Sequence, residues 1–121
     1  MVLPLSSLTL NQRLARHVGR RVMIEAVDFS SEAGRLQSVT SRFARVSSQN
    51  FVPATLDHIV LLDIQNPLPC TQVSIRTTYR GTGTARVRRV GRDFVETIES
   101  HSGHRRRVIM PFDKVVSIEE I

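Results

Sequence analysis

Several residue types are scarce in this sequence, and their scarcity excludes some classes of protein. The 121 residues include no Trp, 5% aromatic residues in all and a single cysteine, Cys70. One cysteine cannot form an intramolecular disulfide, which excludes a disulfide-stabilised fold and favours the reducing cytoplasm as the compartment. With so few aromatics, the core must consist of Val, Ile and Leu, and this composition favours strands.

Long apolar runs are absent too. No segment approaches the ~18 apolar residues that a membrane-spanning helix needs, so we expect no membrane partner. Residues 1–10, MVLPLSSLTL, are too short and too polar for a secretory signal peptide. The length of 121 residues allows one domain or two very small ones, and 40% hydrophobic residues suffice for a core.

Lysine is almost missing from a basic chain. Lys114 is the one lysine among 17 Lys and Arg residues, and 11 acidic residues leave a formal net charge of +6. Arginine binds phosphate in a bidentate manner, so this charge is compatible with attraction to phosphate polyanions. A GC-rich genome produces the same excess of arginine, so composition alone does not establish a ligand.

One helix is predicted, close to the N-terminus. Thr9 is followed three residues later by Gln12, which is the spacing of a capping box. Leu10, Leu14 and Val18 then fall on one helical face, and the glycine that follows ends the helix.

The rest of the chain is predicted to form short strands. Residues 21–29 are rich in apolar and β-branched residues and run into a polar turn. Residues 34–48 also fit a helical spacing, but their glycine, threonine and serines weaken a helix, so we predict strands with a bulge or turn near Ser41. The proline-rich segment QNPLPC forms a linker that divides the chain into residues 1–66 and 71–121.

The two parts of the chain resemble each other when two gaps are allowed. Each part then consists of about five short strands separated by turns, which is typical of a small closed or nearly closed barrel. The matched segments are VMIEAV at 22–27 with VSIRTT at 73–78, SVTSRFARV at 38–46 with RRVGRDFVET at 88–97, and LDHIVLLD at 56–63 with FDKVVSIE at 112–119.

The segments GRRVMIEAV, GRLQSVTSRFARV and VPATLDHIVLLDI, after a leading helix, resemble the Sm/LSm fold, the five-stranded barrel of LSm proteins and bacterial Hfq. The second part is similar to the same barrel without its helix, close to the small Sm-like barrels of Gram-positive bacteria. The resemblance implies an all-β fold, in which a short N-terminal helix precedes tandem Sm-like five-stranded barrel halves, 1–66 and 71–121. It also implies assembly into homo-oligomeric rings through edge strands.

The turns that hold an RNA base in that family differ here. Residues 40–44 and 91–95 lack the asparagine of the family's first turn, and residues 53–55 and 110–112 lack both its Arg-Gly pair and the Tyr-Lys-His signature of Hfq. A base-specific pocket is therefore not expected, whereas unspecific binding through phosphate charge is unaffected.

Arginine clusters in the second part are the sequence feature that suggests a ligand. The first part carries a net charge of +2 and residues 67–121 carry +4. Strand alternation predicts that Arg86 and Arg88 lie on an outer face while Ala85 and Val87 point inward. The segment HSGHRRRV is predicted to form an exposed hairpin tip, and solvated faces commonly carry such runs as well. The predicted nucleic-acid-binding residues are Arg86, Arg88, Arg89, Arg92, Arg105, Arg106 and Arg107.

Residues for catalysis or metal binding are hard to assemble from the sequence. His101 and His104 form at most half of a metal site, because Glu99 is the one carboxylate near them in sequence. Cys70 has no histidine nearby that would activate it. We therefore expect no metal, no cofactor and no enzymatic activity.

Two functions of different class follow from these observations. The first is a non-enzymatic binding module that binds RNA, with DNA as the weaker alternative, through arginines and mainly by phosphate charge. The second is a structural protein whose edge strands build rings or other oligomers and whose arginines only maintain solubility, without a nucleic-acid ligand.

Overall fold

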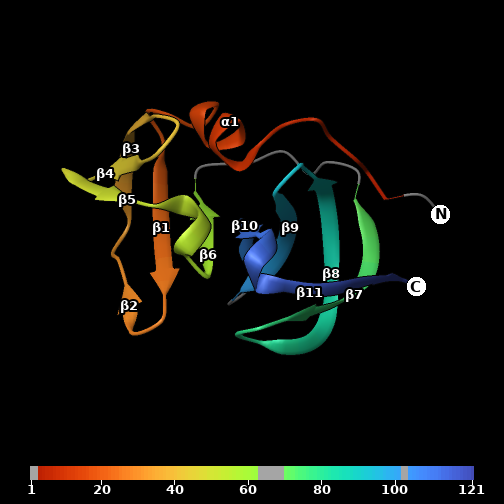
Figure 1. Ribbon diagram of the computed structural model, residues 1–121. Helices are drawn as coiled ribbons and strands as arrows, with labels where there is room; N and C mark the ends of the chain where they lie inside the picture. The colour runs from red at the N-terminus through yellow and green to blue at the C-terminus, as the bar shows by residue number, and fades with distance from the viewer. Residues whose placement is uncertain (1–2, 63–69, 102–103) are drawn as a thin grey trace.

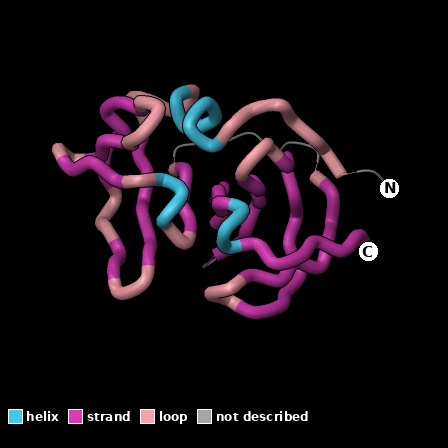
Figure 2. Tube along the Cα trace, in the orientation of Figure 1, coloured by secondary structure: helices cyan, strands magenta, loops and turns pink. Residues whose placement is uncertain are grey.

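The computed structural model describes residues 3–62, 70–101 and 104–121 (Figure 1). In these ranges the chain is mostly β, with one short α-helix and two 3-10 helices (Figure 2). The strands form one antiparallel sheet that is open, with β5 and β11 at its two ends. The expected all-β class with a short N-terminal helix is confirmed, and the sheet does not close on itself.

The strand order of the sheet is β11-β7-β8-β9-β10-β6-β1-β3-β4-β5, and β2 pairs with β1 beside this path. The elements are α1 (Leu10–Ala15), β1 (Arg21–Ala26), β2 (Phe29–Ser30), β3 (Gly34–Val39), β4 (Ala44–Val46), β5 (Gln49–Phe51), η1 (Pro53–Thr55), β6 (His58–Leu61), β7 (Thr71–Thr77), β8 (Gly81–Val90), β9 (Phe94–His101), β10 (His104–Pro111), η2 (Phe112–Lys114) and β11 (Val115–Glu120).

The helix begins as predicted and ends earlier. Thr9 Oγ1 accepts a hydrogen bond from the Gln12 backbone N–H at 3.2 Å, and Gln12 Oε1 accepts one from the Thr9 N–H at 2.9 Å, which completes the capping box. Leu10 and Leu14 are buried. The expectation for Val18 is wrong: the helix ends at Ala15, and Val18 lies beyond it with 44% of its surface exposed.

The two parts of the chain pair their strands in the same way. Setting β2 aside, the order β6-β1-β3-β4-β5 in the first half corresponds to β11-β7-β8-β9-β10 in the second. Val22 pairs with Gly34, and the residues 51 positions further along, Val73 and Ala85, pair with each other. The predicted internal repeat is therefore present in the strand pairing, although the sheet is open.

The same irregularities recur at matching positions. The register between β3 and β4 shifts between Leu36 and Ser38, and the register between β8 and β9 shifts between Val87 and Arg89, again 51 positions later. The turns that follow are closed by equivalent backbone hydrogen bonds, from Thr40 N–H to Phe43 O at 2.8 Å and from Gly91 N–H to Phe94 O at 2.9 Å. The predicted turn near Ser41 is the first of these.

One hairpin differs in length between the halves. Ala44 pairs with Phe51, seven residues on, whereas its counterpart Val95 pairs with Met110, fifteen residues on. The β9–β10 hairpin is thus eight residues longer, and equivalent residues after it lie 59 positions apart, as Ile59 and Ile118 do.

The last strands of the two halves confirm this spacing. Ile24 pairs with Ile59 in the first half, and Ile75 pairs with Ile118 in the second. The sequence match of residues 56–63 with 112–119 is therefore wrong by three residues. Similar apolar residues at neighbouring positions allowed the shift, which only the strand pairing reveals.

The halves are joined by the pairing of β6 with β10. Ile59 lies opposite Ile109, and Val60 lies opposite Val108, with all four side chains buried. Successive residues of a strand point to opposite faces, so the two isoleucines enter one hydrophobic core and the two valines enter another. The first core contains Leu10, Leu14, Val22, Ile24, Leu36, Ala44, Val46, Leu56, Ile59, Leu61, Phe94 and Ile109, and the second contains Val60, Val73, Ile75, Val87, Val90, Val95, Val108 and Met110.

The predicted linker falls largely on residues 63–69, which lie outside the described residues, and so does Gly103 of the predicted hairpin tip. The division into 1–66 and 71–121 stays a prediction. Each of the two cores nevertheless takes side chains from both sides of that boundary.

Gly91 is required by the packing of Phe94. A Cβ atom at Gly91 would overlap the ring of Phe94, which is fully buried, whereas a Cβ atom at Gly83 would meet nothing within 4 Å. We predict that Gly91→Ala lowers the free energy of unfolding by about 1–3 kcal/mol, the usual cost of overpacking a core. Gly83→Ala is the matched control and should change it by less than about 0.5 kcal/mol. Urea unfolding of both variants measures this, and equal effects would contradict the packing argument.

Candidate functional site

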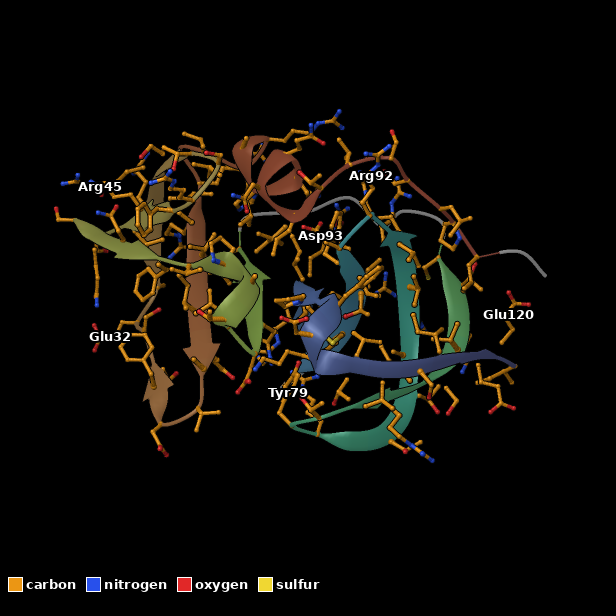
Figure 3. All side chains as sticks on the ribbon, in the orientation of Figure 1. Glu32, Arg45, Tyr79, Arg92, Asp93 and Glu120 are labelled. Atoms are coloured by element: carbon orange, nitrogen blue, oxygen red, sulfur yellow. The ribbon has the colours of Figure 1, made fainter. Side chains whose placement is uncertain are left out.

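Helix α1 contacts both halves of the chain. Its Leu10 and Leu14 side chains pack in the first core, while the Leu10 N–H donates a hydrogen bond to Asp93 Oδ1 of the β8–β9 turn at 2.6 Å. Figure 3 shows Asp93 directly beside α1. The helix therefore holds the β8–β9 turn of the second half against the first half.

A buried carboxylate strengthens this contact. Glu96 on β9 has no exposed surface, and Arg13 of α1 donates to Glu96 Oε1 from Nε at 2.6 Å. Arg107 Nη1 lies 3.3 Å from Oε2, and Arg89 Nε lies 3.4 Å from Oε1. Burial lowers the pKa of Arg89 and Arg107 below the ordinary value even though Glu96 opposes this shift. Three elements, α1, β8 and β10, thus converge on one carboxylate.

The structure does not bring the seven predicted arginines together on one surface. Arg89 and Arg107 contact the buried Glu96, and Arg106 lies 3.8 Å from Glu99. Arg88 sits at the shift in register between β8 and β9 and is partly buried, so the simple alternation predicted for this strand fails there. The exposed members of the set are Arg86, Arg92 and Arg105.

Two of the exposed arginines line separate hollows. Arg92 borders an open groove of about 650 Å³ beside α1, together with Arg16, Ser7, Thr9 and Gln12. No acidic residue lines this groove among the described residues. The sequence analysis did not select Arg16. It could have done so, because Arg16 lies two positions after Leu14, which is buried, and therefore falls on the solvent side of α1. The second hollow, of about 360 Å³, is lined by Gln72, Arg80, Thr84, Ala85, Arg86, Ile98 and Glu99.

A second polar cluster also links the halves. His58 on β6 is 2% exposed, and its Nδ1 lies 2.9 Å from the hydroxyl of Tyr79 in the β7–β8 turn. Its Nε2 lies 3.0 Å from Glu25 Oε2 on β1, and Arg80 binds Glu99 on β9. Burial lowers the pKa of His58 and raises the pKa of Tyr79 to about 12. The lowered pKa favours a neutral imidazole at His58, and the tautomer protonated on Nε2 allows Nδ1 to accept from the Tyr79 hydroxyl while Nε2–H faces Glu25.

No metal site is found in the part of the chain that the structure describes. No group of three or more His, Cys, Asp or Glu residues there is placed to hold an ion. The side chains of His101 and His104, the sequence-based candidates, lie outside the described residues. Among the described residues, no helix has the length and apolar character needed to cross a membrane.

The two ends of the sheet are unpaired edges. Within the described residues, β5 pairs only with β4, and β11 pairs only with β7. Six of the nine exposed large apolar side chains of the described residues lie on or near these two edges. Near β5 these are Phe29, whose ring lies 5.7 Å from that of Phe51, with Phe43 and Val52; near β11 they are Phe112, Val116 and Ile121.

No family model, curated protein or solved structure matches the chain. The two halves can still be compared with each other, and that comparison identifies β5 as the counterpart of β10 and β11 as the counterpart of β6. The candidate functional site is therefore the pair of free edges, which correspond to the two strands that join the halves.

The buried carboxylate generates a stability prediction. Glu96→Gln removes the negative charge shared by Arg13, Arg89 and Arg107, and breaking such a buried pair costs about 3–5 kcal/mol of unfolding free energy. Glu99→Gln on the same strand is the control, because the Glu99 side chain is 19% exposed and paired near solvent; its cost should stay below about 1 kcal/mol. Urea unfolding decides between them, and equal costs would show that Glu96 is not the central contact.

Proposed function

We propose that the protein is a non-enzymatic assembly module with tandem Sm-like halves, in which copies of the chain join end to end through β5 and β11. The repeated strand order, with the same shift in register in both halves, supports the tandem arrangement. The observation that carries the proposed function is the pairing of β6 with β10, because it joins the counterparts of the two free edges.

The internal junction provides a template for a junction between copies. When β2 is set aside, β10 is the fourth strand of the second half, and it pairs with β6, the last strand of the first half. By the same count, β5 is the fourth strand of the first half and β11 is the last strand of the second, and each has one edge that pairs with no described strand. A contact of this kind is heterologous: it closes into a ring or extends into a filament, depending on the rotation between copies.

The template also specifies a register. Ile109 lies opposite Ile59 at the internal junction, and Val108 lies opposite Val60. The β5 counterparts of β10 residues lie 59 positions earlier, and the β11 counterparts of β6 residues lie 59 positions later. This register places Asn50 of one copy opposite Ile118 of the next, and Gln49 opposite Glu119. Polar residues replace the valine pair, so the junction between copies is weaker and more reversible than the one inside the chain.

The hairpin before β5 leaves Asn50 suited to such pairing. Ser47 and Ser48 both have positive φ, 50° and 66°, which is the conformation of a two-residue type I′ turn. In such a hairpin Val46 and Gln49 exchange backbone hydrogen bonds, so the next residue, Asn50, directs its N–H away from β4 and toward the free edge.

A proline at this position tests the assembly. Asn50→Pro removes the outward N–H, and proline is tolerated on an edge strand where that group faces solvent. We predict that the wild type and Asn50→Ala, which keeps the N–H, form oligomers, whereas Asn50→Pro is a monomer. Sedimentation velocity across a concentration series measures this, with circular dichroism to verify the fold.

Two results would contradict the proposal. One is a wild-type chain that stays monomeric up to about 100 μM, where even a weak interface associates measurably. The other is a folded Asn50→Pro variant that assembles as the wild type does.

A second candidate function, unspecific binding of RNA or another polyanion, is favoured by the groove beside α1. We propose Arg92 and Arg16 as its phosphate contacts, since both border an open groove that no described acidic residue lines. Arg86 and Arg105 are exposed and available to add to it. The pairing of Arg89 and Arg107 with Glu96 leaves these two less suited to a phosphate than the sequence suggests.

Salt dependence tests this second candidate. Fluorescence anisotropy with a short U-rich single-stranded RNA should show binding that weakens as salt rises. Arg16→Ala and Arg92→Ala should each lower the slope of log affinity against log salt by about 0.7, the value per phosphate contact on a single strand. Arg76→Ala, an exposed arginine on β7, is the charge-matched control. Equal effects of all three variants would exclude the groove as the binding site.

A further inference from the structure

The charged residues of the two free edges differ in sign. The β4–β5 hairpin, residues 44–51, carries Arg45 and no acidic residue, whereas β11 carries Glu119 and Glu120 and no basic residue. Arg45 and Glu120 are both exposed, and neither forms an ion pair with a described residue. Figure 3 shows them at opposite ends of the molecule, so they do not meet within one chain.

The internal junction between β6 and β10 shows which side chains surround the counterparts of Arg45 and Glu120. Glu96 occupies the position on β9 that Arg45 occupies on β4, 51 residues earlier. Arg107 on β10 contacts Glu96 at 3.3 Å and lies opposite Leu61 on β6. The ion pair of Glu96 with Arg107 therefore joins β9 and β10, the two strands next to β6, on the same face of the sheet as Leu61.

The corresponding positions between two copies carry a different set of residues. The counterpart of Leu61 is Glu120, 59 positions later, whereas the position of Arg107 falls on Ser48, a residue of the β4–β5 turn and not of a strand. The short hairpin therefore carries no long side chain at the position that Arg107 takes at the internal junction. Cross-strand partners and alternate residues of a strand share a face, so Arg45 and its partner Asn50 lie on one face with Ile118 and Glu120 of the next copy in this register.

We infer that Arg45 of one copy reaches across β5 and pairs with Glu120 of the next, and that this ion pair determines the polarity of the assembly. The inference rests on the proposed assembly through β5 and β11. Adjacent strands are about 4.8 Å apart, and the extended arginine and glutamate side chains together span the one intervening strand. Pairing of β5 with β5, or of β11 with β11, places like charges together and is disfavoured.

Charge reversal tests this inference. Arg45→Glu alone places two glutamates at every junction, and Glu120→Arg alone places two arginines there. Each variant should assemble about tenfold less tightly than the wild type, because like charges replace opposite ones. An equimolar mixture of the two should recover wild-type assembly, since every junction between unlike copies then joins opposite charges.

Native mass spectrometry of the mixture measures how many copies of each variant a complex contains. The two variants differ in mass, so complexes with equal numbers of each should dominate. Glu119→Arg is the matched control: it makes the same charge change next to Glu120, but points to the other face. It should weaken assembly less, and mixing it with Arg45→Glu should not restore it.

The outcomes separate the two proposals. A monomeric wild type overturns both the assembly and the ion pair. Wild-type oligomers that Asn50→Pro disrupts, but that neither charge reversal weakens, leave the assembly intact and overturn the ion pair. Recovery in the Glu119→Arg mixture equal to that with Glu120→Arg also overturns the specific pair, because general charge attraction would then suffice.

Discussion

The pairing of β6 with β10 is the contact on which the rest of the structure depends. Two of the three residue pairs at the junction are wholly apolar, and their alternating side chains supply two cores at once, Ile59 and Ile109 on one face and Val60 and Val108 on the other. A sheet that is buried on both faces needs side chains packed against each face. Here each half contributes side chains to the core of the other. The halves are therefore structurally interdependent despite their repeated topology.

The buried ionic cluster follows from that arrangement. Glu96 belongs to the second half and is fully buried, and its closest cation is Arg13 of α1 in the first half. A carboxylate in such a place is stable only with hydrogen-bonding cations around it, which Arg13, Arg89 and Arg107 supply. Arginines that appear in the sequence as a basic surface are thus partly internal.

Local features were predictable from the sequence, and long-range ones were not. The capping box at Thr9 and Gln12, the turn near Ser41 and the repeat all rest on nearby residues or on shared patterns. The register of β11 and the burial of Glu96 depend on contacts between distant segments. The shift in register at Arg88 defeats strict alternation, and nothing in the local sequence marks it. The free edges became recognisable only once strand order was known.

The longer β9–β10 hairpin makes the two halves unequal, and this inequality has a geometric consequence. In any closed ring of such chains, short and long hairpins alternate around the circumference, so the number of halves is even. A chain with a single half carries no such restriction on parity. The rim of such a ring therefore repeats once per chain, with twice the angular spacing of the halves. A ligand that binds the long hairpin would have half as many sites as there are halves.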